Sequence, residues 1–204
     1  MFRIFVILAI TIVYIFLFGP EPSFGFKYIE NFFSEEDFAK IKHECFKLSN
    51  YLTEEKNTTA ENRISTIVSD DNTIAKLCNS QTTKNKLKIP ENTVPADVPI
   101  ELRKYKIGGA MDWHKDTVLY TKPQYEMIYT VHNTSDSKTM WYDPDKRKVH
   151  EIETKPNSMI VVKADDVQHR VSPVSKGDRS IIKFAYTETT KKAPGYFINA
   201  LNIN

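Results

Sequence analysis

Two histidines and an aspartate in the second half of the chain have the residue types and the spacing of a metal site. His114 and Asp116 stand two residues apart, so on an extended strand both side chains point to one face while Lys115 points to the other. His169 lies far along the chain, just after an apolar run and a turn. Two imidazoles and one carboxylate can hold one face of Fe(II) and leave positions open for oxygen and a further ligand. We therefore predict that these three side chains bind one metal ion.

An arginine that follows His169 extends this pattern. Arg179 comes two residues after Gly177 and directly before an apolar, β-prone run. If His169 and Arg179 lie on neighbouring strands of a small barrel, the planar guanidinium can reach into the cavity and hold a carboxylate through two parallel hydrogen bonds. A dicarboxylate that is also a 2-oxo acid would then bind this clamp with one end and chelate the metal with the other.

A sheet of short strands is what must position these residues. Runs of β-prone residues recur through residues 100–190 and are broken by clusters of Pro, Gly, Asn and Asp. These runs cover residues 101–105, 127–131, 158–162 and 180–186. Strands of this length and spacing are typical of an antiparallel sandwich or barrel. We predict an α+β, mainly β, chain whose core over residues 100–190 is a double-stranded β-helix, or jelly roll.

Helices are predicted in the region that precedes this core. Ser34 stands before three acidic residues, a pattern typical of a helix N-cap and first turn. Apolar residues then recur at helical spacing, which predicts an amphipathic helix over about residues 35–52, and a short helix is predicted over residues 73–78. Residues 26–99 are therefore predicted to form an N-terminal helical support for the core, and residues 191–204 a C-terminal tail.

The first 19 residues are almost wholly apolar, and Arg3 is their only charged residue. A helix rises about 1.5 Å per residue, so residues 1–19 reach most of the way across a bilayer core. We predict a signal-anchor transmembrane segment over residues 1–19 and a linker over residues 20–25. A signal peptide cleaved near residues 23–25 is the alternative.

The position of Arg3 also predicts the orientation of the chain. A basic residue before the apolar segment stays on the cytosolic side, which places the remaining residues in the lumen or outside the cell. We therefore expect a single-pass membrane protein, located in the endoplasmic reticulum if the source is eukaryotic or a virus of a eukaryotic host.

Charge and composition exclude several classes of protein. The chain has 28 basic and 26 acidic residues, so it lacks the excess of Lys and Arg that is typical of nucleic-acid binding. Apolar residues make up 41% of the chain and charged residues 26%, which is typical of a folded globular protein and not of a disordered or polytopic one. We predict one folded domain that binds no nucleic acid.

The chemical state of two pairs of residues depends on the cellular compartment. Cys45 and Cys78 form either a disulfide in an oxidising compartment or two buried thiols. Asn57 and Asn133 begin Asn-x-Ser/Thr sequences, which are glycosylation acceptors on the luminal side of a membrane. The sequence decides neither the pairing nor the glycosylation.

The spaced motifs together resemble one known family. The elements are His114-Lys115-Asp116, His169 with Val171, Gly177-x-Arg179 and, upstream, Tyr105-Lys106-Ile107-Gly108-Gly109. They are similar to those of the 2-oxoglutarate- and Fe(II)-dependent dioxygenases, specifically the prolyl 4-hydroxylase-like branch, in which a Tyr-x-x-Gly-Gly segment precedes the iron-binding strand. Residues 28–36 also resemble the opening strand and helix cap of this family. The resemblance covers about residues 26–188.

This resemblance implies roles for five residues. It makes His114, Asp116 and His169 the ligands of a catalytic Fe(II). It makes Arg179 the partner of a 2-oxoglutarate carboxylate and Tyr105 a second partner of this co-substrate. O2 is the other co-substrate, and ascorbate is implied as the reductant that keeps the iron as Fe(II). Because Asp116 is present, the resemblance implies hydroxylation rather than halogenation, coupled to decarboxylation of 2-oxoglutarate to succinate and CO2.

The resemblance defines the substrate less closely. Family members that act on prolyl residues commonly carry a Gly-Gly-x-Thr element, which is absent from the corresponding residues 135–142. We expect hydroxylation of a prolyl residue in a peptide or protein, as in the procollagen-proline 4-dioxygenases. A non-prolyl or small-molecule substrate stays open. So do a cupin-like metal-binding barrel that does not turn over a 2-oxo acid and a non-catalytic barrel that binds a peptide.

Overall fold

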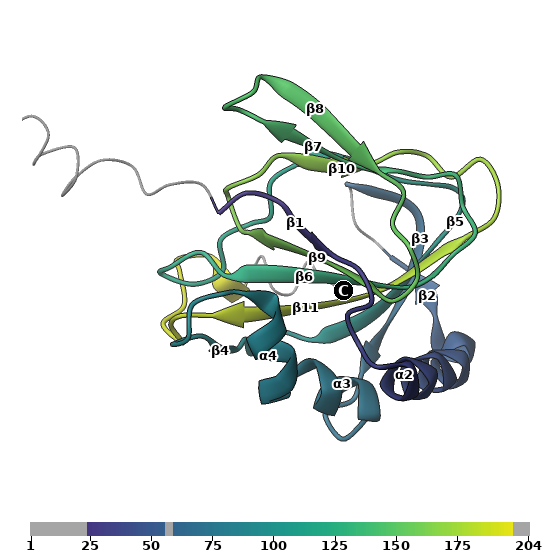
Figure 1. Ribbon diagram of the computed structural model, residues 1–204, viewed down its shortest axis with the longest axis horizontal. Helices are drawn as coiled ribbons and strands as arrows, with labels where there is room; N and C mark the ends of the chain where they lie inside the picture. The colour runs from purple at the N-terminus through teal and green to yellow at the C-terminus, as the bar shows by residue number, and fades with distance from the viewer. Residues whose placement is uncertain (1–23, 56–58, 198–204) are drawn as a thin grey trace, which may run out of the picture.

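One curled antiparallel sheet organises most of the chain (Figure 1). The computed structural model describes residues 24–55 and 59–197, and it contains eleven strands in this sheet. The strands are β1 (Lys27–Ile29), β2 (Thr53–Glu54), β3 (Ala60–Val68), β4 (Val94–Pro95), β5 (Ile100–His114), β6 (Tyr125–Asn133), β7 (Thr139–Asp143), β8 (Lys148–Ile152), β9 (Ser158–Lys163), β10 (His169–Val171) and β11 (Arg179–Thr187). The main path through the sheet is β1-β9-β6-β11-β5-β10-β7-β8, with β3 also paired to β5.

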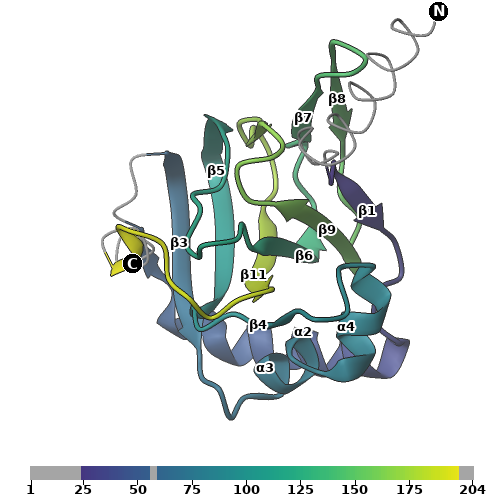
Figure 2. The same cartoon turned by 90° about the vertical axis from the view of Figure 1, so that its left-hand side faces the viewer.

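Strand β5 joins the two parts of this sheet. Residues 101–105 of β5 pair with β11, whereas Met111 and His114 near its end pair with β10. The change of partner lets the sheet curl, so β10 and the β7–β8 hairpin lie apart from the helices (Figures 1 and 2). This curled, mainly antiparallel arrangement is consistent with the predicted jelly-roll core.

Three helices cover one side of the sheet, opposite the β7–β8 hairpin (Figure 2). They are α2 (Glu35–Leu48), α3 (Thr73–Cys78) and α4 (Gln81–Leu87). The Ser34 hydroxyl accepts a hydrogen bond from the Asp37 amide at 3.1 Å, which makes it the predicted N-cap of α2. Helix α2 ends at Leu48 rather than near residue 52, and a short 3-10 turn follows it over Ser49–Tyr51. Ile41 of α2 and apolar residues of α3 pack with the sheet in the main hydrophobic core.

Strand β3 lies in the region that the sequence predicts to be helical and weakly patterned. It pairs with β5 along most of its length. This pairing is not recognisable from the sequence, because the inward-facing residue near the middle of β3 is Arg63. Arg63 is 2% exposed and forms an ion pair with Glu55. A buried charge in the middle of a strand breaks the apolar alternation by which strands are recognised. Residues 26–99 therefore contribute strands as well as helices.

The predicted membrane segment falls outside the part of the chain that the structure describes. Residues 1–19, Asn57 and residues 198–204 of the predicted tail all lie beyond it. Within the described ranges, no helix has the length and apolar character needed to cross a membrane.

The two cysteines are free thiols in the hydrophobic core. Burial raises the pKa of Cys45 to about 12, and it raises the pKa of Cys78 as well. Both thiols therefore stay protonated and behave as small apolar groups. At the second predicted glycosylation acceptor, the Asn133 side-chain amide donates to the Thr154 carbonyl at 2.8 Å.

The turn before β11 gives a test of the fold. Gly177 has a φ of +69°, and a Cβ added there would lie 2.3 Å from the Thr134 carbonyl oxygen. Gly25 has a similar φ of +73°, but a Cβ there meets nothing within 4 Å. Left-handed backbone costs a non-glycine residue about 1–3 kcal/mol. We expect Gly177→Ala to lower the free energy of unfolding by clearly more than Gly25→Ala, because only Gly177→Ala adds a backbone clash.

Urea unfolding of the two variants and the parent measures this difference. Equal losses of stability in the two variants would show that the turn moves freely to accept the added methyl group.

Candidate active site

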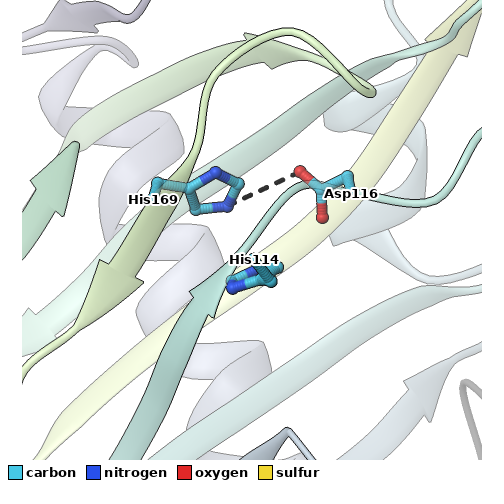
Figure 3. A group of neighbouring side chains, drawn as sticks. All are labelled: His114, Asp116 and His169. Atoms are coloured by element: carbon cyan, nitrogen blue, oxygen red, sulfur yellow. Dashed lines mark ion pairs between the residues drawn. The ribbon is translucent and has the colours of Figure 1, made fainter. Parts of the chain in front are cut away.

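The three predicted metal ligands converge in space (Figure 3). His114 ends β5 and His169 begins β10, and the two residues are direct partners in the sheet with ring centroids 4.3 Å apart. One ligand atom from each of His114, Asp116 and His169 lies within 4.8 Å of the others. Asp116 stands two residues beyond the end of β5, in a segment without regular structure.

Hydrogen bonds orient both imidazoles toward the centre of this group. His114 Nδ1 lies 2.7 Å from the Asp112 carbonyl, and His169 Nδ1 lies 2.9 Å from the Val167 carbonyl. A carbonyl oxygen only accepts, so each Nδ1 carries a proton, and in the neutral form of each ring Nε2 offers its lone pair to a metal. Burial and the neighbouring His169 lower the pKa of His114, which favours the neutral imidazole that a metal requires.

The carboxylate of Asp116 completes the donor set. Burial acts to raise its pKa, but Lys183 and the two histidines together hold the pKa below its usual value. The carboxylate is therefore ionised, and its Oδ2 lies 3.6 Å from His169 Nε2. Within the described part of the chain this Oδ2 has no hydrogen-bond donor. Two neutral imidazole nitrogens beside one open carboxylate oxygen fit Fe(II) or a similar divalent metal.

The three ligands line a pocket that also contains a buried arginine. Arg179 is 1% exposed, and its Nη1 donates to the Thr139 hydroxyl at 2.9 Å. Its Nε has no acceptor among the described residues, although the atom is buried. Tyr105 is the direct partner of Arg179 across β5 and β11, and both line the pocket. An unpartnered buried donor next to a hydroxyl fits the carboxylate of a ligand.

The strands that carry His169 and Arg179 are arranged differently from the sequence prediction. Their strands, β10 and β11, are not neighbours, because β5 lies between them and pairs with both. The five predicted site residues nevertheless all line one pocket. Strand β5 is what brings them together.

Arg63 of β3 is a pocket residue that the sequence patterns do not identify. Its Nη1 donates to the Tyr105 hydroxyl at 2.9 Å, while its Nε and Nη2 donate to Glu55. Arginine has no acceptor, so the Tyr105 oxygen accepts this hydrogen bond, and the hydroxyl donates to the Met111 sulfur at 3.8 Å. A thioether sulfur is a weak acceptor, so a ligand carboxylate can replace it as the partner of the Tyr105 hydroxyl. In the sequence, the only indication of this pocket residue is an arginine within a polar stretch.

Buried arginines line the pocket, and one of them lacks an acidic partner. Arg63 pairs with Glu55, and Arg103 pairs with Glu101. No carboxylate of the described residues pairs with Arg179. An unpaired guanidinium in a low-dielectric pocket favours an anion.

Comparison with known proteins identifies the fold. By sequence, the chain matches no protein-family model and no curated protein. A prolyl hydroxylase from Trichoplax adhaerens, in complex with a hypoxia inducible factor oxygen degradation domain peptide fragment, has a TM-score of 0.66 at 14% identity, covering 80% of this chain and 84% of that chain. A Pseudomonas putida prolyl-4-hydroxylase has a TM-score of 0.62 at 12% identity, covering 79% and 91%.

A third match is to a structure that contains a metal, 2-oxoglutarate and a further small molecule. HygX from Streptomyces hygroscopicus, with nickel, 2-oxoglutarate and hygromycin B bound, has a TM-score of 0.59 at 9% identity, covering 79% of this chain and 82% of that chain. The protein therefore has the fold of the 2-oxoglutarate- and Fe(II)-dependent oxygenases, in the form found in prolyl hydroxylases. This finding confirms the resemblance that the motifs predicted.

The metal site makes a direct prediction. We expect the full-length chain to bind one Ni(II) or Mn(II), which replace Fe(II) without oxidation. In His169→Ala the dissociation constant should rise by more than about 100-fold, because the loss of a residue that only orients a ligand already costs about 10- to 100-fold. Isothermal titration calorimetry measures this change.

His132→Ala is the matched control for this experiment. Its imidazole is largely exposed and faces Asp178 at 3.4 Å, away from the pocket, so this variant should keep the parental affinity. Equal metal affinity in the parent and His169→Ala would contradict the assignment of the ligands.

Proposed function

We propose that the protein is an Fe(II)- and 2-oxoglutarate-dependent oxygenase that hydroxylates its substrate and converts 2-oxoglutarate to succinate and CO2. One observation carries this proposal. A single pocket holds two histidines and a carboxylate beside a buried, unpartnered Arg179 Nε and the Tyr105 hydroxyl. A co-substrate with a metal-chelating 2-oxo acid and a second carboxylate matches both groups at once.

Each group of residues has a separate task in this proposal. His114, Asp116 and His169 would hold Fe(II), which supplies the activation of O2 when bound. Arg179 and Tyr105 would donate hydrogen bonds to the far carboxylate of 2-oxoglutarate and fix its orientation. Apolar side chains also line this pocket and would limit the access of water: Ile128, Val171 and Ile181.

A peptidyl proline is the substrate that we favour. The Trichoplax adhaerens neighbour is a prolyl hydroxylase in complex with a peptide fragment, and the Pseudomonas putida neighbour is also a prolyl hydroxylase. The match to HygX, with hygromycin B bound, supports a small-molecule substrate as the second candidate. A cupin-like barrel without 2-oxo acid turnover has no use for the buried positive charge around Arg179.

Turnover of the co-substrate tests the reaction class. The full-length chain, loaded with Fe(II) under anaerobic conditions and then given O2, 2-oxoglutarate and ascorbate, should form succinate slowly even without a substrate. His114→Ala should form none, and Arg179→Met should do so only at high 2-oxoglutarate. His132→Ala should match the parent, because its side chain lies outside the pocket. Metal binding without succinate in the parent would instead support a cupin-like or binding function.

The affinity for 2-oxoglutarate tests the role of Tyr105 separately from catalysis. Tyr105→Phe removes the hydroxyl that Arg63 polarises. A hydrogen bond to a charged group contributes about 1.5–3 kcal/mol, so binding of 2-oxoglutarate to the Ni(II)-loaded protein should weaken by about 10-fold or more. Calorimetry should show no change in the affinity for Ni(II) itself.

Tyr129→Phe is the control for this substitution. Its hydroxyl is also buried, but Tyr129 belongs to the main core outside the pocket, and its hydroxyl donates to Asn157 at 2.9 Å. This variant should lose stability and keep its affinity for 2-oxoglutarate. A loss of affinity in Tyr129→Phe equal to that in Tyr105→Phe would show that Tyr105 acts only through general packing.

A further inference from the structure

Lys183 of β11 lines the same pocket as the metal ligands. Its side chain is 19% exposed, and its ammonium nitrogen lies 3.8 Å from Asp116 Oδ1. Strand alternation places it on the same face as Arg179, four residues earlier. Neither the motifs nor the proposed reaction gives this lysine a role.

Asp116 needs a partner that fixes its side chain. Strand β5 ends at His114, and the residues from Lys115 to Leu119 form no regular structure. The backbone of Asp116 is held through its carbonyl, which accepts from the Asp165 amide at 3.0 Å. That contact leaves the carboxylate free to rotate. The ammonium of Lys183 on Oδ1 selects the orientation in which Oδ2 faces the histidines.

The Lys183 ammonium has a second acidic partner. Glu126 of β6 is buried, and its Oε2 lies 3.5 Å from the Lys183 nitrogen. Gln124 donates to the other oxygen of Glu126 at 2.8 Å, so this carboxyl is also fixed. A continuous series of contacts therefore runs from Gln124 through Glu126 and Lys183 to Asp116. Partners of this kind orient metal ligands and tune their affinity.

We propose that Lys183 is a positioning residue of the metal site, which holds the Asp116 carboxylate in the orientation that presents Oδ2 to the metal. This inference rests on the proposed function, because that function makes Asp116 a metal ligand. An ammonium also repels a cation. If Lys183 orients Asp116, its loss weakens metal binding. If Lys183 only repels the metal, its loss strengthens metal binding.

The affinity of the full-length chain for Ni(II), measured by calorimetry without 2-oxoglutarate, tests this proposal. Lys183→Met should weaken Ni(II) binding by about 10- to 100-fold. Lys183→Arg, which keeps the positive charge and a donor, should recover most of the parental affinity. Lys104→Met is the matched control: this lysine also pairs with an aspartate of the sheet region, Asp178 at 3.1 Å, but it lies outside the pocket and should leave the affinity unchanged.

Thermal unfolding of the metal-free variants shows whether each is folded and how much stability it has lost. A purely structural Lys183 would lower this stability and leave the Ni(II) affinity of the folded protein unchanged. Unchanged or tighter Ni(II) binding in folded Lys183→Met overturns the proposal. Because the assay contains no 2-oxo acid, a failure of the proposed reaction would appear only in the succinate assay and would not alter this result.

Discussion

The geometry of strand β5 is the constraint on which the site depends. Tyr105 and His114 are nine residues apart on it, which corresponds to about 30 Å in a straight strand, yet both line one pocket. The strand therefore has to bend between them. It does so at Gly108, where φ is +80°, and the bend is held by hydrogen bonds from the Gly108 amide to the Val174 carbonyl and from the Val174 amide to the Gly109 carbonyl. From this bent strand, pairing with β10 and β11 brings the remaining groups to the pocket.

The interior charges indicate a pocket selected for binding rather than for stability. A buried donor without an acceptor costs about 1–3 kcal/mol, and Arg179 Nε is such a donor within the described structure. Arg63 and Lys183 are also held in the barrel by buried carboxylates, at a cost that hydrophobic side chains would avoid. A bound anion at Arg179 and a bound cation at Asp116 would offset these costs in the folded state. One molecule of a 2-oxo dicarboxylate would connect the two sites, because one end would bind Arg179 and the other end the metal at Asp116.

The sequence predicted the parts of the site whose signal is local. The His-x-Asp pair, the distal histidine and the arginine after a glycine were recognisable from residue type and spacing, and the cap at Ser34 placed the start of α2. Arg63 and Lys183 were not recognisable, because a polar residue inside a strand has the same appearance in sequence whether it faces solvent or a pocket. The position of Asp116 beyond the end of β5 depends on tertiary pairing, which no local pattern records. The membrane segment over residues 1–19 stays a prediction.

A crystal structure of the full-length chain with Mn(II) and 2-oxoglutarate, grown without oxygen, would test the central claim most directly. We predict one metal ion on His114, Asp116 and His169, with a 2-oxoglutarate carboxylate within hydrogen-bonding distance of Arg179 Nε and the Tyr105 hydroxyl. Metal bound at these ligands with 2-oxoglutarate absent from the pocket, or bound away from Arg179, would contradict it.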